Sequence, residues 1–503
     1  MVNFDTSKIK VKKLYIIALD QGTSSSRAVL FNKAGEILSI EQQEFEQIFP
    51  KSGWVEHNPH EILTSQLEVF DKLLINNSID PLEIDSIGIT NQRETTVVWN
   101  KTTGEPIYNA IVWQDKRTSN LCSELISEGH EEHFKNSSGL VIDSYFSGTK
   151  INWILDNIKG AENLAENNNL LFGTVDTWLI WNLTKGKVHA TDYSNASRTL
   201  LFDINKLEWN KKSLELLNIP ESILPSIKNS SDDFGHYEYE GADIPIRGVI
   251  GDQQAALFGQ CCFDSGEAKN TYGTGCFMLM NTGSDRIKSD NGLLTTIAWG
   301  IDGNIEYALE GSVFIAGAAI QWLRDGLKII NDSNETENLA NQANKDEVIV
   351  VPAFAGLGAP YWDMYARGAI FGLTRDTGIA ELSRATLESL AFQTKDVLNA
   401  MEEDSGIQLQ SLNVDGGACA NNYLMQFQAD ILGTPVNRPN IIESTALGAA
   451  FMAGIKTGFW NKKDLKTMKS INQVFTPKMK HSEADKKYLL WQEAIKRSMN
   501  WTK

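Results

Sequence analysis

The chain has 503 residues, more than one ordinary hydrophobic core accommodates, so we expect two large domains. A hydrophobic content of 42% and a charged content of 22% are typical of a soluble globular protein. The net charge of -18 argues against non-specific binding to nucleic acids or anionic membranes, because both need a basic surface. A local basic pocket for a small anion remains compatible with this charge.

The cysteines and the short apolar runs indicate a cytoplasmic protein without a membrane span. The cysteines are odd in number and lack C-x-x-C spacing, which fits a reducing compartment and gives no zinc site. Residues 1–13 are polar and lack the apolar centre of a signal peptide. No stretch approaches the roughly 18 apolar residues of a membrane span. We expect small buried side chains at the five cysteines, Cys122, Cys261, Cys262, Cys276 and Cys419.

The first half of the chain opens with a predicted meander. Its three strands are joined by polar turns and lie at residues 14–19, 27–31 and 36–40. A helix should follow, because Asn58 can serve as its N-cap and Pro59 suits its first position. The stripe predicted to be buried on this helix is Leu63, Leu67, Phe70 and Leu74. A strand at 84–90 then gives the alternation typical of α/β folds.

The second half restarts in the same style after Gly259. The predicted strands lie at 268–272, 276–280, 294–299 and 305–309, with a turn at 273–275. The predicted helices lie at about 315–330, 378–403, 421–432 and 444–455. Two polar segments, 228–233 and 331–344, are expected to be loops. A meander at the start of each half predicts two related α/β domains that face each other across a cleft, with the boundary near residues 255–262.

Two segments place an acid at the end of a predicted strand. In residues 20–27 (DQGTSSSR), Gly22 would let a phosphate approach the backbone, while hydroxyls and Arg27 would add donors. Asp20 could hold Mg²⁺ through water. A hairpin turn rich in small polar residues is the alternative. In residues 249–256, Asp252 beside Gln253 suits the proton of a hydroxyl, and a helix N-cap is its alternative role.

Two further segments suit a polyol and a nucleotide. Arg93 and Glu94 follow the strand at 84–90 and supply donors and acceptors side by side. The glycines in residues 415–417 (DGG) follow a strand at 412–414 and open a helix, so a flat base could lie against the backbone. A plain strand-to-helix turn is the alternative for these glycines.

Several common motifs are absent from the sequence. There is no G-x-x-x-x-G-K-[ST], no H-R-D or D-F-G, and no G-x-G-x-x-G that opens a helix after a strand. P-loop enzymes, protein kinases and the usual dinucleotide fold are therefore excluded. His130 and His133 lie in a charged run, which favours a solvated helix face over a metal site.

Together these segments resemble the FGGY carbohydrate-kinase family, and within it the kinases that act on glycerol. The resemblance covers roughly residues 14–500, and the motifs that carry it are residues 20–27, 91–94 (NQRE), 145–150 (YFSGTK), 251–254 (GDQQ) and 415–417. It implies two RNase H-like domains of the actin and hexokinase type. The N-terminal domain, residues 1–258, would bind glycerol and carry the phosphate loop. The C-terminal domain, residues 259–503, would bind the adenine nucleotide.

The resemblance also implies roles for individual residues. Asp252 would be the catalytic base and Asp20 would be near the metal ion. The glycerol site would comprise Arg93, Glu94, Trp113, Tyr145, Asp252, Gln253 and Phe277. The ATP site would comprise Thr23, Ser24, Ser25, Arg27, Thr274, Gly317, Gln321, Ala418 and Asn422. For the three aromatic residues an ordinary core position is the alternative, and for Gly317 and Gln321 it is helix packing.

The activity implied is the ATP- and Mg²⁺-dependent phosphorylation of glycerol to sn-glycerol 3-phosphate, the first step of glycerol use. A homodimer or larger assembly is also implied. In some relatives the loop matching residues 237–243 binds a sugar bisphosphate through an arginine or carries a phosphorylated histidine; here it is acidic, with Glu238 at the histidine position. Two rival functions remain open: a kinase of another polyol or ketose, and a nucleotide-gated binding protein.

Overall fold

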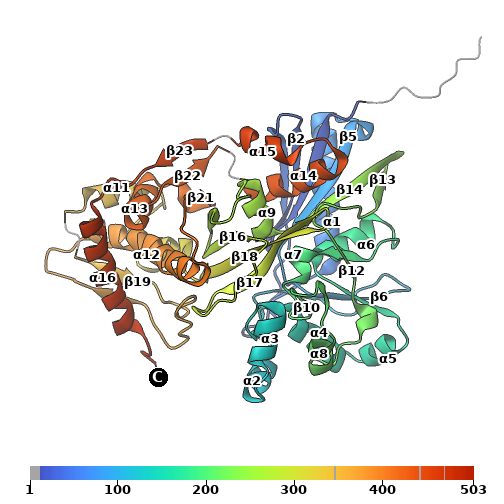
Figure 1. Ribbon diagram of the computed structural model, residues 1–503, viewed down its shortest axis with the longest axis horizontal. Helices are drawn as coiled ribbons and strands as arrows, with labels where there is room; N and C mark the ends of the chain where they lie inside the picture. The colour runs from blue at the N-terminus through green and yellow to red at the C-terminus, as the bar shows by residue number, and fades with distance from the viewer. Residues whose placement is uncertain (1–11, 345–346, 441–442, 470, 503) are drawn as a thin grey trace, which may run out of the picture. The chain divides into compact units, whose positions relative to one another are not determined.

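The computed structural model describes residues 12–344, 347–440, 443–469 and 471–502 (Figure 1). The expectation about an N-terminal signal peptide therefore lies mostly outside the described residues. Two compact units are formed. Unit 1 comprises the residues up to Gly259 with Ile297–Ile305 and Thr445–Met468, and unit 2 comprises Gln260–Thr296, Glu306–Ser444 and the residues from Lys469 onward.

Unit 1 is built on a six-stranded sheet with the strand order β13-β14-β5-β1-β2-β3 (Figure 1). Neighbours β1, β5 and β14 run parallel, while β1, β2 and β3 form the antiparallel meander expected from the sequence. β13 pairs antiparallel with β14 at the other edge. The strand bounds are β1 Tyr15–Gln21, β2 Ser25–Asn32, β3 Ile37–Glu44, β5 Ile84–Asn91, β13 His236–Tyr239 and β14 Ala242–Gly251.

Helix α1 (Pro59–Asn77) begins as predicted, with the Asn58 side chain accepting the His60 N–H. Its buried apolar face differs from the predicted stripe. Leu63 and Leu67 are only half-buried, and the residues that lie deepest are Ile62, Val69, Phe70, Leu73 and Leu74. The helix carries two adjacent apolar rows, and the sheet contact selects the row that begins at Ile62.

Small residues let helix α14 (Ser444–Thr457) lie directly on this sheet. A Cβ atom added at Gly88 in β5 would lie 2.2 Å from the carbonyl oxygen of Ala449. Only glycine permits this approach of helix to strand.

The other elements of unit 1 surround the sheet and its carboxyl edge. The helices are α2 Ser119–Ser127, α3 Glu131–Ser138, α4 Ser147–Asn157, α5 Ala161–Glu166, α6 Val175–Leu183, α7 Tyr193–Ala196, α8 Lys211–Leu216, α9 Asp252–Gly259 and α15 Lys462–Met468. The short strands are β4 Glu56–His57, β6 Val97–Asn100, β7 Ala110–Ile111, β8 Leu170–Gly173, β9 Ala190–Asp192, β10 Phe202–Asp203, β11 Glu208–Trp209 and β12 Ser226–Lys228.

The second large sheet has seven strands in the order β17-β18-β16-β15-β21-β22-β23. Here too an antiparallel meander, β15-β16-β18, is followed by two parallel strands, β21 and β22, and an antiparallel edge strand, β23. This repeats the topology of the first sheet, so the predicted relation between the halves is confirmed. The bounds are β15 Ala268–Tyr272, β16 Cys276–Gly283, β17 Leu294–Ile301, β18 Asn304–Val313, β21 Leu412–Asp415, β22 Val436–Pro439 and β23 Ile471–Phe475.

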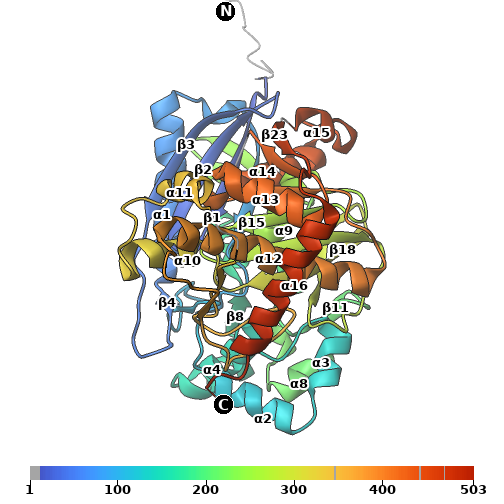
Figure 2. The same cartoon turned by 90° about the vertical axis from the view of Figure 1, so that its left-hand side faces the viewer.

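The helices of unit 2 pack around the long helix α12 (Figure 2). Their bounds are α10 Gly317–Gln321, α11 Glu335–Gln342, α12 Ile379–Ser405, α13 Asn422–Leu432 and α16 His481–Ser498. The short strands β19 Ile349–Val351 and β20 Ala369–Phe371 pair beside them. The predicted helices at 378–403, 421–432 and 444–455 are confirmed to within a few residues.

Two predictions for unit 2 need correction. The helix expected at 315–330 is present but shorter, over residues 317–326, and its second half, Trp322–Gly326, is π-helical. The segment 331–344, expected to be a loop, contains α11. Its polar composition hides a narrow row of buried Thr336 and Ala340 with half-buried Leu339, spaced by three and one, which faces the core of unit 2.

All five cysteines are free and buried, as predicted. Among the described residues, no helix has both the length and the apolar character that a membrane crossing demands.

Candidate active site

Three parallel strands of the unit 1 sheet end at the same edge. Gln21 in β1 is opposite Asn91 in β5, and Asn91 is opposite Gly251 in β14. The carboxyl ends of neighbouring parallel strands are where α/β proteins bind their ligands. The segments at this edge contain the predicted residues Asp20, Arg93, Glu94 and Asp252.

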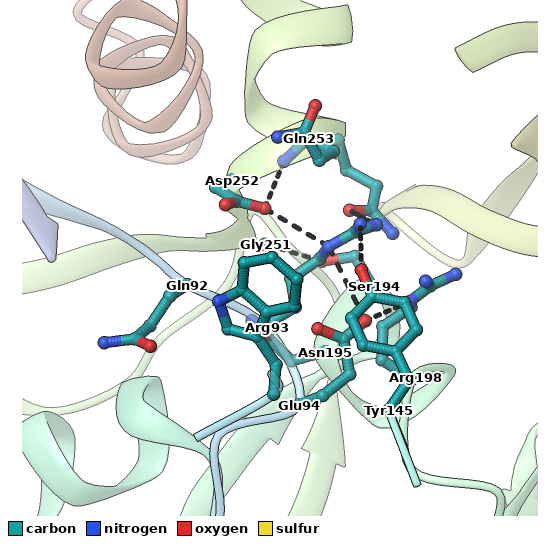
Figure 3. Close-up of polar contacts among 12 residues, drawn as sticks. Gln92, Arg93, Glu94, Tyr145, Ser194, Asn195, Arg198, Gly251, Asp252 and Gln253 are labelled. Carbon is teal, nitrogen blue, oxygen red and sulfur yellow. Dashed lines mark hydrogen bonds and ion pairs between the residues drawn. The ribbon is translucent and has the colours of Figure 1, made fainter. Parts of the chain in front are cut away.

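Arg93 is the centre of a cluster of polar side chains (Figure 3), which we call the acceptor cluster: Arg93, Glu94, Tyr145, Arg198 and Asp252. The Nε atom of Arg93 lies 3.2 Å from Asp252 Oδ1 and 3.8 Å from Glu94 Oε1, so one guanidinium serves two carboxylates. Its Nη2 atom is 3.4 Å from Tyr145 Oη. Only 3% of Arg93 is exposed. A buried guanidinium with fixed partners is a rigid set of donors, suited to recognition of a small polar molecule.

Asp252 is the most accessible carboxylate of the acceptor cluster. The exposed fraction of its side chain is 31%, against 2% for Glu94. It is the first residue of α9, and its Oδ1 atom accepts the backbone N–H of Gln253 at 2.7 Å. This bond and the Arg93 contact both favour the ionised carboxylate, which can accept a proton. Asp252 therefore combines a fixed position at the start of α9 with an accessible carboxylate.

Glu94 is held in an unusual backbone conformation by buried partners. Its φ angle of 59° lies in the left-handed region, which is uncommon for a residue with a side chain. Ser147 donates to its carbonyl oxygen at 2.9 Å, and Arg198 Nε donates to its carboxylate at 2.7 Å. The guanidinium of Arg198 also lies 5.6 Å from the centre of the Tyr145 ring. The surroundings thus fix both the backbone and the charge of Glu94.

Sequence reasoning missed Arg198. The side chain is fully buried, and it follows the short helix α7, far from any recognised motif. In the sequence, Arg198 directly follows Asn195-Ala196-Ser197, a triplet that matches the glycosylation pattern by chance. No other feature of the sequence drew attention to this arginine. The structure shows Asn195 to be buried and hydrogen-bonded to Asn91 at the end of β5.

A buried network around α7 holds the end of β14. Asp192 Oδ1 accepts the Ser194 hydroxyl at 2.9 Å, and that hydroxyl accepts the backbone N–H of Gly251 at 2.9 Å. Asp192 also accepts from the hydroxyl of Ser230 at 2.7 Å. Burial raises the pKa of the Asp192 carboxyl, while these donors act in the opposite direction. Because Gly251 precedes Asp252, the network helps to place the predicted base.

The loop between β1 and β2 has the compact geometry expected of a phosphate site. The backbone N–H of Gly22 donates to the carbonyl oxygen of Ser25 at 2.9 Å and closes the turn. Ser24 is exposed and Thr23 is half-buried, so both can meet a ligand. Ser25 is buried, and its hydroxyl accepts from Gln42 at 3.2 Å. The structure therefore brings the predicted phosphate residues together, with Thr23 and Ser24 the most accessible of the hydroxyl groups.

Trp113 joins the phosphate loop to the acceptor cluster. Its ring packs edge-to-face with that of Tyr145, with 5.5 Å between the ring centres. Its indole Nε1 donates to Thr23 Oγ1 at 3.0 Å. The aromatic wall predicted for glycerol therefore also contacts a residue predicted for phosphate, and the sequence offered no sign of that bond.

A neutral hydrogen-bond network supports the same loop from behind. Gln92 donates to Gly22 O at 3.1 Å, and Gln47 donates to Thr23 O at 3.1 Å. The Oε1 atom of Gln47 is 2.8 Å from His57 Nε2. Burial lowers the pKa of His57 to about 4, so the ring is neutral near pH 7 and donates a hydrogen bond without adding charge.

Asp20 is the predicted residue at the metal ion. It is 7% exposed, and one oxygen lies 3.9 Å from Arg27 Nη1. Among the residues that the structure describes, no group of three or more His, Cys, Asp or Glu could hold a metal ion. A single carboxylate beside the predicted phosphate loop nevertheless suits Mg²⁺, which prefers oxygen ligands and keeps several waters.

Unit 2 contains a pocket of about 500 Å³ at the carboxyl edge of its own sheet. The predicted residues Thr274, Gly317, Gln321 and Ala418 all line it. Gly416, which precedes the lining residue Gly417, has φ +83°, and a Cβ added there would lie 2.4 Å from Tyr272 O. Its glycine is therefore required by the turn itself.

Two residues of unit 2 that were predicted for the sites do not line this pocket. Asn422 is not among the lining residues; its side chain donates to Glu337 at 3.1 Å and accepts from Arg438 at 3.0 Å. Asn421 lines the pocket in its place. Phe277 is half-buried in β16, opposite Thr271, and its contact with an acceptor remains a prediction.

Sequence reasoning also missed one wall of this pocket. Residues of α11 and the turn before it contribute Ser333, Asn334, Thr336, Glu337 and Asn338. Because the segment was expected to be a loop, none of them was proposed. The spacing of Thr336, Leu339 and Ala340 was the available signal.

Comparison with known proteins agrees with this two-unit arrangement. Residues 15–259 match the N-terminal domain and residues 268–457 the C-terminal domain of the FGGY family of carbohydrate kinases. The chain is 60% identical over 494 residues to the glycerol kinase of Alkaliphilus metalliredigens, covering 97% of this chain and 99% of that protein. It is 59% identical to the glycerol kinase of Fusobacterium nucleatum, covering 97% and 99% of the two chains.

Solved structures show the same fold. The glycerol kinase of Plasmodium falciparum with ADP is similar at a TM-score of 0.91 and 38% identity, covering 96% of this chain and 98% of that chain. A gluconate kinase from Lactobacillus acidophilus has a TM-score of 0.87 at 21% identity over the same shares of the two chains. The second likeness concerns the fold alone.

Proposed function

This chain belongs to the FGGY family of carbohydrate kinases, and on that premise we propose that it transfers the γ-phosphoryl group of ATP to glycerol. The products are sn-glycerol 3-phosphate and ADP. The geometry that carries the proposal is the pairing of Arg93 with Asp252 at 3.2 Å on the sheet edge that also bears the phosphate loop. The relatives that are about 60% identical and act as glycerol kinases favour glycerol as the acceptor.

Asp252 acts as the general base in this reaction. It takes the proton of a terminal glycerol hydroxyl, whose oxygen forms the new bond to the γ-phosphorus. The bond from that phosphorus to the bridging oxygen breaks, and ADP leaves with the electron pair. The contact with Arg93 and the position at the start of α9 hold the Asp252 carboxylate in place and favour its charged form.

The acceptor cluster and its neighbours recognise the three hydroxyls. Arg93 and Tyr145 can donate, and Glu94 can accept, while Trp113 packs on the carbon edge. Gln253 and Phe277 complete the proposed site. Leaving a buried donor unpaired when a smaller alcohol binds costs about 1–3 kcal/mol, which supports selectivity.

The residues that we propose for the nucleotide are found in each of the two units. Thr23, Ser24, Ser25 and Arg27 bind the phosphates, and Thr274, Gly317, Gln321, Ala418 and Asn422 bind the rest of ATP. Residues 1–258 thus form the glycerol and phosphate-loop domain, and residues 259–503 the nucleotide domain. The exposed backbone at Gly417, where an added Cβ would meet no atom within 4 Å, supports contact with a flat base.

Mg²⁺ is part of the proposal. Asp20 would hold it through water, because its carboxylate lies beside the phosphate loop and offers the oxygen donor that the ion prefers. When bound, the ion neutralises charge on the phosphate oxygens.

A coupled assay of ADP release tests the proposed function. We expect release to depend on glycerol and on Mg²⁺, with little activity on xylulose or gluconate as acceptors. Preference for xylulose or gluconate would support the rival sugar kinase, and ATP hydrolysis independent of any acceptor would support the nucleotide-gated binding protein. Either result would overturn the proposal.

We also propose a cytoplasmic location and a homodimeric or larger assembly. Five free buried cysteines support the reducing compartment. Light scattering coupled to size-exclusion chromatography decides the assembly, because a monomer has a mass of 56.0 kDa.

A further inference from the structure

We propose that Trp113 positions the phosphate loop: its indole N–H directs the hydroxyl hydrogen of Thr23 toward a bound phosphate oxygen, and so couples acceptor binding to nucleotide binding. The inference rests on the proposed function and goes beyond it, because it gives the aromatic wall of the acceptor site a second role. Trp113 does not itself touch phosphate in this proposal. It acts through Thr23.

The direction of the Trp113–Thr23 hydrogen bond is fixed by chemistry. The indole Nε1–H can only donate, so at 3.0 Å the hydroxyl oxygen of Thr23 must accept. A hydroxyl has one hydrogen and two lone pairs. With one lone pair engaged by the indole, the hydrogen of Thr23 points away from Trp113 and remains a donor for another oxygen.

The backbone of the loop leaves little other freedom to this hydroxyl. The N–H of Gly22 is bonded to Ser25 O at 2.9 Å, and the carbonyl oxygen of Thr23 accepts from Gln47 at 3.1 Å. The side chain of Gln92 donates a hydrogen bond to the carbonyl oxygen of Gly22 at 3.1 Å. These bonds hold the backbone on both sides of Thr23, and the bond from Trp113 restricts the rotation of the Thr23 side chain.

The position of the Trp113 indole depends in turn on the acceptor cluster. The ring lies edge-to-face against Tyr145 at 5.5 Å, and the backbone N–H of Trp113 donates to Thr95 Oγ1 at 3.3 Å. A molecule packed against the indole restricts the ring and its N–H together. Acceptor binding then orders Thr23 before phosphate arrives, which is positive coupling between the two sites.

The substitution Trp113→Phe tests the inference because it keeps a flat apolar wall and removes the N–H. Binding of AMP-PNP with Mg²⁺ is measured by calorimetry, with and without glycerol. We expect the Kd for AMP-PNP to rise about tenfold, because the Thr23 hydroxyl is no longer directed and its hydrogen bond to the charged phosphate weakens. We also expect glycerol to lose most of its ability to tighten AMP-PNP binding, while the KM for glycerol changes less than about threefold.

Two further variants separate this role from a general loss of structure. Trp209→Phe is the matched control, because Trp209 Nε1 also donates at 3.0 Å, to Pro225 O, outside the site. It should leave the Kd for AMP-PNP unchanged. Thr23→Val should raise that Kd, and adding Trp113→Phe to it should have no further effect, because both changes remove the same bond.

The proposal is overturned if Trp113→Phe leaves nucleotide binding unchanged, or if its effect and that of Thr23→Val add. A rise in the KM for glycerol alone would show that Trp113 is only a wall. These outcomes differ from failure of the proposed function, in which the unaltered protein would release no ADP on addition of glycerol while the binding cycle could still be measured.

Discussion

At the scale of single residues, the acceptor cluster is a row of alternating charges. Arg198 contacts Glu94, Glu94 contacts Arg93, and Arg93 contacts Asp252, at 2.7, 3.8 and 3.2 Å. The exposed fraction of the side chain rises along this row from 0% at Arg198 to 31% at Asp252. Buried charges persist only when they are paired. The row thus ends in one accessible carboxylate, Asp252, which is supported by buried and paired charges.

The change Asp252→Asn should lower turnover by about 10²–10⁴, because it removes the general base. The side chain keeps its size and can still accept from Gln253, so the fold and the affinity for AMP-PNP should change little. Steady-state kinetics and calorimetry measure the two effects. Near-normal turnover in this variant would exclude Asp252 as the base.

The change Arg198→Ala should weaken glycerol binding indirectly, through Glu94. It removes the 2.7 Å contact that Arg198 makes with the buried carboxylate of Glu94, at a cost of about 3–5 kcal/mol in unfolding free energy. The KM for glycerol should rise more than tenfold. Arg198→Lys keeps the charge and should recover part of that KM; if both variants bind glycerol normally, Glu94 does not depend on Arg198.

At the scale of elements, helix α6 carries a carboxyl group with no access to water. Asp176 is fully buried in the first turn and accepts from the hydroxyls of Thr174 and Thr191. Burial, more than any other cause, raises the pKa of this carboxyl to about 7, and the nearby Asp192 acts in the same direction. The folded protein therefore keeps a proton here that the unfolded chain loses above about pH 4.

This difference predicts how stability depends on pH. The contribution of Asp176 is fully present below about pH 4 and is lost as the pH rises toward 7, because the folded state binds more protons across that range. Asp176→Asn removes the effect. The difference in melting temperature, variant minus unaltered protein, should therefore increase as the pH rises from about 4.5 to about 7. The increase should correspond to a few kcal/mol of unfolding free energy. A constant difference across that range would contradict the shifted pKa.

At the scale of the whole molecule, the chain builds the same sheet twice and gives each copy its own core. One hydrophobic cluster covers the unit 1 sheet, with Ile17, Phe70 and Trp178 among its members; another covers the unit 2 sheet, with Met278, Phe392 and Trp491. The carboxyl edge of each sheet carries one part of the proposed site. Duplication of a sheet thus provides two edges of the kind at which α/β proteins bind ligands.

Hydrogen exchange should report these two edges separately. Glycerol alone should protect the amides near residues 93–94, 145 and 252, because it fixes the acceptor cluster. AMP-PNP with Mg²⁺ should protect residues 22–25 and the pocket segments at 272–274, 317–321 and 417–421. Ethylene glycol at equal concentration is the solvent control. Protection of the unit 2 pocket by glycerol alone would contradict the assignment of the acceptor to unit 1.

Much of this architecture could be predicted from the chain alone, because its causes are local. Short runs of strand-forming residues bounded by turn residues mark β1, β5 and β15 within one or two residues, and Asn58-Pro59 marks the start of α1. The glycine, hydroxyl and acid residues that follow these strands cluster in short segments. Their chemistry indicated phosphate, a base and a nucleotide before any packing was known.

Only the tertiary structure decided which distant side chains complete the sites. Arg198 lies 104 positions from Glu94, and Trp113 lies 90 positions from Thr23; no local pattern links them. The pocket wall of α11 was hidden because two buried residues and one half-buried leucine suffice to dock a polar helix. Periodicity and turn chemistry act between near neighbours, whereas buried charge pairs and pocket walls arise where packing brings remote segments into contact.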